Sequence, residues 1–133
     1  MNDRYLFKAK RIDNGEWVQG ALLDGESHCL IGQEIKFSPY IEHECKIVGY
    51  EVDRNTICQC TGLKDRNGKL IWENDIVEDE KGNLYKAFWQ SNYYQFSWVC
   101  VKSEIFLIGT KWDLWSIRSY EIEVIGSIFD NKE

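Results

Sequence analysis

The sequence predicts a mainly β protein built of antiparallel strands and hairpins. Turn-forming residues recur about once per 8 to 12 residues, a spacing typical of antiparallel β proteins. Runs in which apolar and polar residues alternate lie between these turns, as expected for strands with one buried face. The 6 Trp, 7 Tyr and 6 Phe supply large apolar surfaces for a core. At 133 residues the chain fits one domain, which we expect to span residues 1–133.

The first predicted element is a hairpin over about residues 5–23. Residues 5–11 alternate between apolar and polar side chains. The turn at 13–15 contains Asn and Gly, which suit left-handed backbone, and the run 17–23 returns as the partner strand.

Further strands are expected at residues 28–31, 33–37, 46–52 and 56–61, with an interruption at Gly32 and a turn at 53–55. Pro39 marks an edge or a loop, because proline has no N–H to donate to a strand ladder. Together these elements predict an N-terminal antiparallel sheet layer over about residues 1–59.

The strongest turn signal in the middle of the chain is Asp65-Arg66-Asn67-Gly68, where Asn67 and Gly68 suit a positive φ. Polar side chains gather at this turn and make it a candidate interaction loop, formed by Lys64, Asp65, Arg66, Asn67 and Lys69. The alternative interpretation is that the Asp, Asn and Gly residues satisfy the geometry of the turn while the basic residues keep it soluble.

After this turn, strands are expected at 70–72, 76–77, 84–89 and 93–101. In the last of these, alternation places one set of side chains on an apolar face, namely Tyr94, Phe96, Trp98 and Cys100. Tyr93, Gln95 and Ser97 would lie on the other, wetter face.

The C-terminal segments are less uniform. Residues 111–118 fit a short helical turn slightly better than a strand. The last strand, about residues 120–129, would have its far end covered on both sides, because Ile125 and Phe129 join an otherwise polar face. An opening Glu-Asn-Asp-Ile-Val at 73–77, then short aromatic strands and a closing strand, predicts a small SH3-like barrel over about residues 70–130.

Charge and composition argue against several classes of function. The net charge is −6, with −3 in residues 1–59 and −3 in residues 60–133, so no basic block is present for duplex nucleic acid. Five cysteines, an odd number, and the lack of a signal-peptide pattern favour reduced thiols and a cytoplasmic location. No apolar run approaches 18 residues, so we expect no membrane span.

No residue pattern indicates catalysis, a cofactor or a metal. Cys58 and Cys60 could supply two zinc ligands, yet the Cys-x₂₋₄-Cys spacing of structural zinc sites is absent. Neither His28 nor His43 stands in a nucleophile context, and no glycine-rich phosphate loop occurs. The carboxylate pairs, Asp75 with Glu78 and Glu121 with Glu123, are better explained as charged turns and solvated strand faces. We therefore expect a non-enzymatic protein without a cofactor.

Five segments of the chain closely resemble the YopX family: Arg4–Phe7, Asn14–Trp17, Gln59–Lys69, Ile71–Val77 and Glu123–Gly126. YopX-type proteins are small, typical of bacteriophages and prophages, and of unestablished biochemical role. Asn74 stands where such proteins usually have Gly, and asparagine also tolerates a positive φ. The resemblance implies a fold, a phage or prophage origin and self-assembly, and it supplies no catalytic residues.

Two functions from different classes remain. The leading hypothesis is an accessory protein that acts through protein contacts, as a homo-oligomer or with an unknown host or phage protein. The alternative is a β-barrel that stacks single-stranded nucleic acid on its aromatic rings, a mode that tolerates weak basicity. Its platform would be Tyr93, Tyr94, Phe96 and Trp98. The acidic balance of the chain disfavours the alternative.

Overall fold

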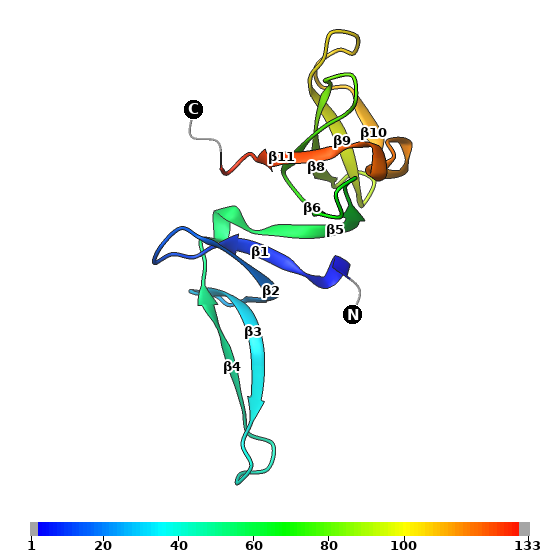
Figure 1. Cartoon of the computed structure of the whole chain (residues 1–133). Helices are drawn as coiled ribbons and strands as arrows, with labels where there is room; N and C mark the ends of the chain where they lie inside the picture. Colours follow the sequence, from blue (N-terminus) through cyan, green and yellow to red (C-terminus); the bar gives the residue numbers. More distant parts are fainter. Residues whose placement is uncertain (1–2, 131–133) are drawn as a thin grey trace. The chain divides into compact units, whose positions relative to one another are not determined.

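A computed structural model describes residues 3–130 of the chain (Figure 1). Within these residues there are eleven strands in two antiparallel sheets, four short 3₁₀ turns and no α-helix, so the prediction of a mainly β, antiparallel protein is confirmed. The chain divides into two compact units, Met1–Gln59 and Cys60–Glu133.

The first antiparallel sheet has six strands, five of them in the order β4-β3-β2-β1-β5. These five strands are β1 (Phe7–Lys10), β2 (Trp17–Asp24), β3 (Cys29–Phe37), β4 (Cys45–Glu51) and β5 (Cys58–Lys64), and the 3₁₀ turns of the first unit are η1 (Asp3–Tyr5) and η2 (Arg54–Thr56). The chain passes into the second unit within β5, which pairs with β1 at its start and with β6 (Leu70–Trp72) at its end.

The predicted first hairpin is confirmed, with Gly15 at φ 72° in its turn. The expected interruption at Gly32 is wrong, because β3 runs without a break from Cys29 to Phe37. Gly32 pairs with Ala21 on one side and Gly49 on the other, and a register shift between Gly32 and Glu34 absorbs the irregularity.

One face of this sheet carries the core of the first unit. Ala9, Cys29, Ile31 and Val52 are buried together there, and Phe7, Val18, Leu22 and Ile57 pack against them. Because side chains alternate along a strand, the neighbours of these residues, such as Ala21 and Gly32, lie on the opposite face.

Beyond Gly32, the outer half of β3, the turn that follows it and residues 45–48 of β4 form a two-stranded projection, which we call the arm and define as residues 33–48 (Figure 1). All residues of β4 are exposed, and β4 is the edge strand of its sheet. The turn at the end of the arm holds Pro39, as predicted for a loop position, and His43 at φ 68°.

Glycine is required where the arm joins the sheet. A Cβ atom on Gly49 would lie 2.3 Å from the backbone oxygen of Ile31, and a Cβ atom on Gly20 would lie 2.2 Å from the backbone oxygen of Gly32. A side chain at Gly49 or Gly20 would collide with the backbone of β3 and force the neighbouring strand away from it. The strands approach this closely only because both residues are glycine.

The second unit contains a five-stranded sheet in the order β10-β9-β8-β7-β11. Its strands are β7 (Asp75–Glu78), β8 (Leu84–Gln90), β9 (Gln95–Lys102), β10 (Lys111–Asp113) and β11 (Glu123–Ser127). Strands β10 and β11 are the two edges and do not pair with each other in the part of the chain that the structure describes, so the expected closed SH3-like barrel is not found.

The segment between β10 and β11 explains why the sheet stays open. It forms two 3₁₀ turns, η3 (Leu114–Ser116) and η4 (Ser119–Glu121), in place of a strand. Leu114 and Ile117 pack against the core from this segment, and the backbone oxygen of Leu114 accepts a hydrogen bond from Trp98 Nε1 at 2.9 Å. The segment therefore covers the sheet rather than extending it. The favoured helical turn within 111–118 is found at Leu114–Ser116.

Trp98 lies at the centre of the second core, with none of its surface exposed, among Ile71, Val77, Ala87 and Ile122.

Two expectations about the strand faces of this unit are wrong. Ser97, placed on the wetter face, is fully buried, because its hydroxyl donates a hydrogen bond to Gln90 Oε1 at 2.8 Å.

The far end of the last strand also differs from the expectation. Ile125 is exposed rather than covered, because the pairing of β11 with β7 shifts register between Val124 and Gly126. Tyr120, which was expected to begin this strand, lies in the 3₁₀ turn η4 and is exposed. Asn74 adopts φ 72°, in agreement with its predicted tolerance of a left-handed turn.

Candidate functional site

The candidate interaction loop at 64–69 is organised by the carboxylate of Asp65. Asp65 Oδ1 accepts hydrogen bonds from the backbone N–H groups of Asn67 and Lys69, both at 2.9 Å. Asp65 Oδ2 accepts a third from the N–H of Val124 in β11, also at 2.9 Å. Only 5% of Asp65 is exposed, so its carboxylate connects two parts of the fold and is not available to a partner.

The environment keeps Asp65 ionised. Burial opposes the charged form, but the N–H donors of Val124, Lys69 and Asn67 and the nearby charge of Lys69 outweigh it, so the pKa of Asp65 is lowered. An ionised carboxylate accepts hydrogen bonds with both oxygens, as the turn and β11 require.

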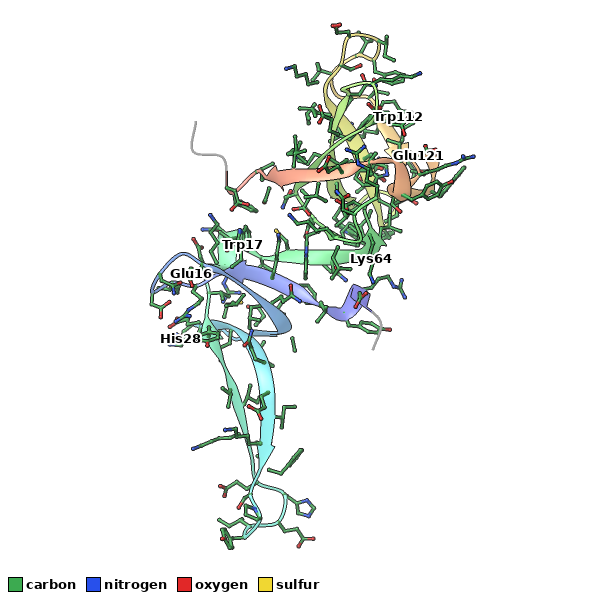
Figure 2. The ribbon with its side chains drawn as sticks, in the orientation of Figure 1. Glu16, Trp17, His28, Lys64, Trp112 and Glu121 are labelled. Carbon is green, nitrogen blue, oxygen red and sulfur yellow. The ribbon has the colours of Figure 1, made fainter. Side chains whose placement is uncertain are left out.

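The next residue is also engaged with the C-terminal part of the unit. The backbone N–H of Arg66 donates to the backbone oxygen of Ile122 at 2.9 Å, and its guanidinium lies 2.6 Å from Glu123 Oε1. Lys64, Asn67 and Lys69 are exposed, and Lys64 marks the end of β5 (Figure 2). The structure thus brings all five predicted residues together, and all of them except Asp65 are exposed to solvent.

The same turn occurs a second time, at Asp79. Asp79 Oδ1 accepts from the N–H groups of Lys81 and Asn83 at 2.9 Å, and a glycine three residues after the aspartate takes a positive φ in each turn, 81° at Gly68 and 84° at Gly82. Asn67 stays outside the left-handed region that the sequence suggested for it.

The second oxygen of Asp79 accepts from Tyr85 Oη and from Asn83 Nδ2, both at 2.9 Å. Burial opposes the charge of Asp79, but these hydrogen bonds together lower its pKa. Burial and the Asp79 hydrogen bond in turn raise the pKa of Tyr85 well above its ordinary value. Both aspartates therefore stabilise turns in their charged form.

The aromatic platform of the nucleic-acid hypothesis does not form one surface. Trp98 is inside the core, and Phe96 packs edge-to-face against Trp89 with ring centroids 5.2 Å apart. Tyr93 and Tyr94 are exposed in the turn before β9, where Tyr94 adopts φ 53°. Stacking of successive bases needs several accessible rings in a row, which this arrangement lacks.

The cysteines and histidines lie apart. Cys29, Cys58, Cys60 and Cys100 are buried, and Cys45 is exposed on the arm. His28 Nδ1 lies 2.7 Å from Glu51 Oε2, while His43 is on the exposed turn of the arm. Within residues 3–130, no group of three or more His, Cys, Asp or Glu side chains is arranged to hold a metal ion. No helix in this range has the length and apolar character to cross a membrane.

The carboxylate pairs are part of the fold. Asp75 is buried and accepts a hydrogen bond from the backbone N–H of Trp72 at 2.8 Å. Glu78 pairs in register with Glu123 across β7 and β11, and Glu123 contacts Arg66. Glu121, which was expected on a solvated strand face, lies in the 3₁₀ turn η4, and the burial of Asp75 was not predicted.

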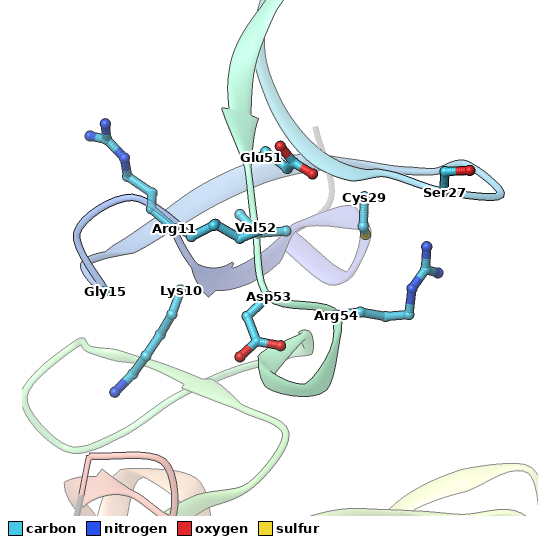
Figure 3. Close-up of a pocket in the computed structure, with 10 residues that line it drawn as sticks. Lys10, Arg11, Gly15, Ser27, Cys29, Glu51, Val52, Asp53 and Arg54 are labelled. Atoms are coloured by element: carbon cyan, nitrogen blue, oxygen red, sulfur yellow. The ribbon is translucent and has the colours of Figure 1, made fainter.

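A hollow in the first unit is lined by charged residues, among them Lys10, Arg11, Asp53 and Arg54 (Figure 3). The guanidinium of Arg11 pairs with Asp13 and that of Arg54 with Asp24, and the two point apart in Figure 3. These cations are neutralised by separate partners, so they do not converge on a common ligand.

The arm is the surface that sequence reasoning missed. Its strands carry large apolar side chains in solvent, with Phe37 exposed by 73%, Ile35 by 59%, Ile47 by 48% and Val48 by 42%. Tyr40 and Ile41 at the turn are exposed as well. The alternating pattern of these residues predicts strands. The pattern does not show whether another element covers them.

A trough in the first unit begins at the inner end of the arm and has a volume of about 570 Å³. Glycine and alanine form its floor, at Gly20, Ala21 and Gly32, and its walls include Leu6, Leu23, Ile35 and Ile47. It lies on the face of the sheet opposite the core, because Ala21 and Gly32 alternate with the buried side of β2 and β3.

The model of the YopX protein family matches residues 6–133. The chain belongs to the YopX family. This match confirms the resemblance found in the sequence, and in this YopX protein it covers both aspartate turns, the trough and the arm. No curated protein matches the chain.

Replacing Asp65 by Asn should destabilise this YopX protein by about 2–3 kcal/mol, because the amide cannot accept hydrogen bonds at both positions and a buried N–H loses its partner. Urea unfolding followed by tryptophan fluorescence measures the change. Glu80→Gln, an exposed loss of charge in the other aspartate turn, is the control and should change stability by less than about 0.5 kcal/mol. Equal effects of the two substitutions would contradict the role of Asp65.

Removing the exposed charges of the same loop should have little effect on stability. The triple variant Lys64→Ala, Arg66→Ala, Lys69→Ala deletes one exposed ion pair, for which a change of at most about 1 kcal/mol is expected. The urea midpoint of the triple variant tests this. A loss as large as that of Asp65→Asn would mean that the basic side chains hold the turn together.

Stability should fall as the pH drops below about 4, the ordinary pKa of an aspartate. The pKa values of Asp65 and Asp79 are lower in the folded chain than in the unfolded chain, so the unfolded chain takes up these protons first and is favoured by acid. Urea midpoints between pH 6 and pH 2.5 measure the dependence. The Asp65→Asn variant should show a shallower dependence, and an unchanged slope would remove Asp65 as a cause.

Proposed function

We propose that this YopX-family protein is a non-enzymatic accessory protein of phage or prophage type that acts in the cytoplasm through protein contacts, first of all with further copies of itself. The observation that carries the proposal is the arm, residues 33–48, where large apolar side chains stand in solvent along both strands. Contiguous exposed apolar surface of this kind is characteristic of interaction sites.

An isolated two-stranded hairpin is only marginally stable in water. Among residues 3–130, no strand pairs with the free edge of β4 and all residues of β4 are exposed. A partner that covers the arm would remove apolar surface from water, which stabilises the assembly by about 25 cal/mol per Å² buried.

The available surface is of the size that a stable complex needs. Six large apolar side chains of the arm are exposed, namely Ile35, Phe37, Tyr40, Ile41, Ile47 and Val48. A large aromatic ring alone covers about 150–250 Å², and standard interfaces bury about 800 Å² per partner. These side chains with the backbone of β4 offer area on that order.

The protein is expected to associate in solution. Sedimentation equilibrium of the full chain between about 1 and 200 µM should give a mass that rises to that of a dimer or larger species. A variant in which residues 34–47 are replaced by Asn-Gly, a favoured two-residue hairpin turn, should stay monomeric at every concentration.

The control is an exposed apolar segment outside the arm. Leu107 and Ile108 are exposed in the loop after β9, and the double variant Leu107→Lys, Ile108→Lys should associate as the unaltered protein does. A strictly monomeric unaltered protein would overturn self-assembly as the function. Association that depends on Leu107 and Ile108, and not on the arm, would show that the arm is not the surface through which the protein associates.

A further inference from the structure

The two faces of the arm differ in charge. Along β4, Cys45 and Ile47 point to one face, and Lys46 and Val48 point to the other. The strand register adds the residues of β3: Phe37 pairs with Cys45 and Ile35 with Ile47, while Lys36 pairs with Lys46 and Glu34 with Val48. One face, which we call the uncharged face, therefore consists of Ile35, Phe37, Cys45 and Ile47. The charged side chains of the arm's strands, Glu34, Lys36 and Lys46, lie on the other.

The uncharged face runs directly into the trough. Ile35 and Ile47 belong to both, and the floor beyond them is formed by Gly32 and Ala21. Phe37 stands at the opposite end of the face and exposes 73% of its surface. The same continuous face thus carries a protruding ring at its outer end and an apolar hollow at its inner end.

Phe37 and the inner part of the trough lie on opposite sides of the Ile35–Ile47 pair, at similar distances along β3. Phe37 is two residues outward from Ile35, and Gln33 and Gly32, which line the trough, are two and three residues inward. At about 3.3 Å per residue each lies roughly 7–10 Å from the pair. A two-fold axis through the Ile35–Ile47 pair would place each Phe37 over the trough of the other copy, which is the self-complementarity that a symmetric dimer needs.

We propose that two copies of the chain pack their arms face to face in opposite directions, uncharged face against uncharged face, with Phe37 of each copy seated in the trough of the other. This inference rests on the self-assembly proposed above and names its surface.

A second copy is the occupant that the face favours. A strongly charged partner finds little to pair with on the uncharged face, because Lys36 and Lys46 lie on the other face, and Glu34 is the charged residue among those that line the trough. Pairing of two β4 edges would satisfy backbone groups, but it would leave Phe37 and the trough in water. Stacked sheets lie about 10 Å apart and interdigitate their side chains, so face-to-face packing buries both.

Two adjacent residues of β4 provide the decisive comparison, because Ile47 and Val48 are similarly exposed, at 48% and 42%, and lie on opposite faces. Sedimentation equilibrium of the full chain should show that Ile47→Lys raises the dimer dissociation constant at least tenfold, whereas Val48→Lys changes it less than threefold. Equal responses, or a larger response to Val48→Lys, would overturn face-to-face packing and leave self-assembly standing. A monomeric unaltered protein would overturn both proposals.

The seating of Phe37 has its own test. Phe37→Ala should weaken the dimer at least tenfold, and Ala21→Trp, which fills the trough from within its own copy, should do the same. Tyr40→Ala, on the same arm and exposed by 93%, should stay within threefold. Circular dichroism spectra equal to that of the unaltered protein exclude misfolding as the cause.

Mixing the two weakened variants separates a specific contact from a general loss of apolar surface. In a mixed dimer, Phe37 of the Ala21→Trp copy is seated in the open trough of the Phe37→Ala copy. The filled trough of the Ala21→Trp copy faces position 37 of the other copy, which has lost its ring. The mixture should therefore associate more tightly than Ala21→Trp alone. A mixture that associates no better than Ala21→Trp alone would overturn the seating of Phe37.

Discussion

The carboxylate of Asp65 is the contact on which the second unit depends most. It lies between its own turn and the last strand, and accepts N–H groups from residues 67 and 69 on one oxygen and from Val124 on the other. Arg66 adds a backbone hydrogen bond to Ile122 and an ion pair to Glu123 beside it. These bonds join the start of the unit to its end, so β11 is held in place from a position nearly sixty residues earlier in the chain.

The sequence predicts the local structure of this protein well, because strands and turns depend on neighbouring residues. The hairpin at Gly15 and the left-handed Asn74 follow from residue type alone. Tertiary contacts decide the positions where prediction is wrong. Ser97 is buried because Gln90 accepts its hydroxyl, and the barrel stays open because residues 114–117 cover the core. Neither partner is signalled by the residues beside these positions.

The same limit explains the candidate sites. The five residues at 64–69 were found because turn chemistry is visible in sequence, but the burial of Asp65 against β11 is not, so a structural carboxylate was grouped with exposed lysines. In the arm the error is reversed, because residues that the sequence pattern suggests are buried are in fact exposed. Ile35 and Ile47 have the pattern of a buried strand face, and only the three-dimensional structure shows that they stay exposed within the part of the chain that it describes.

The two aspartate turns have a consequence for how this protein can vary. In each, the aspartate and the glycine three residues later have fixed tasks, a carboxylate that collects N–H groups and a left-handed backbone. The two residues between them, at 66–67 and 80–81, contribute their backbone to the turn and direct their side chains outward. Surface chemistry at these four positions can therefore change by substitution while the turn stays the same, which separates the residues that specify the fold from those free to acquire new contacts.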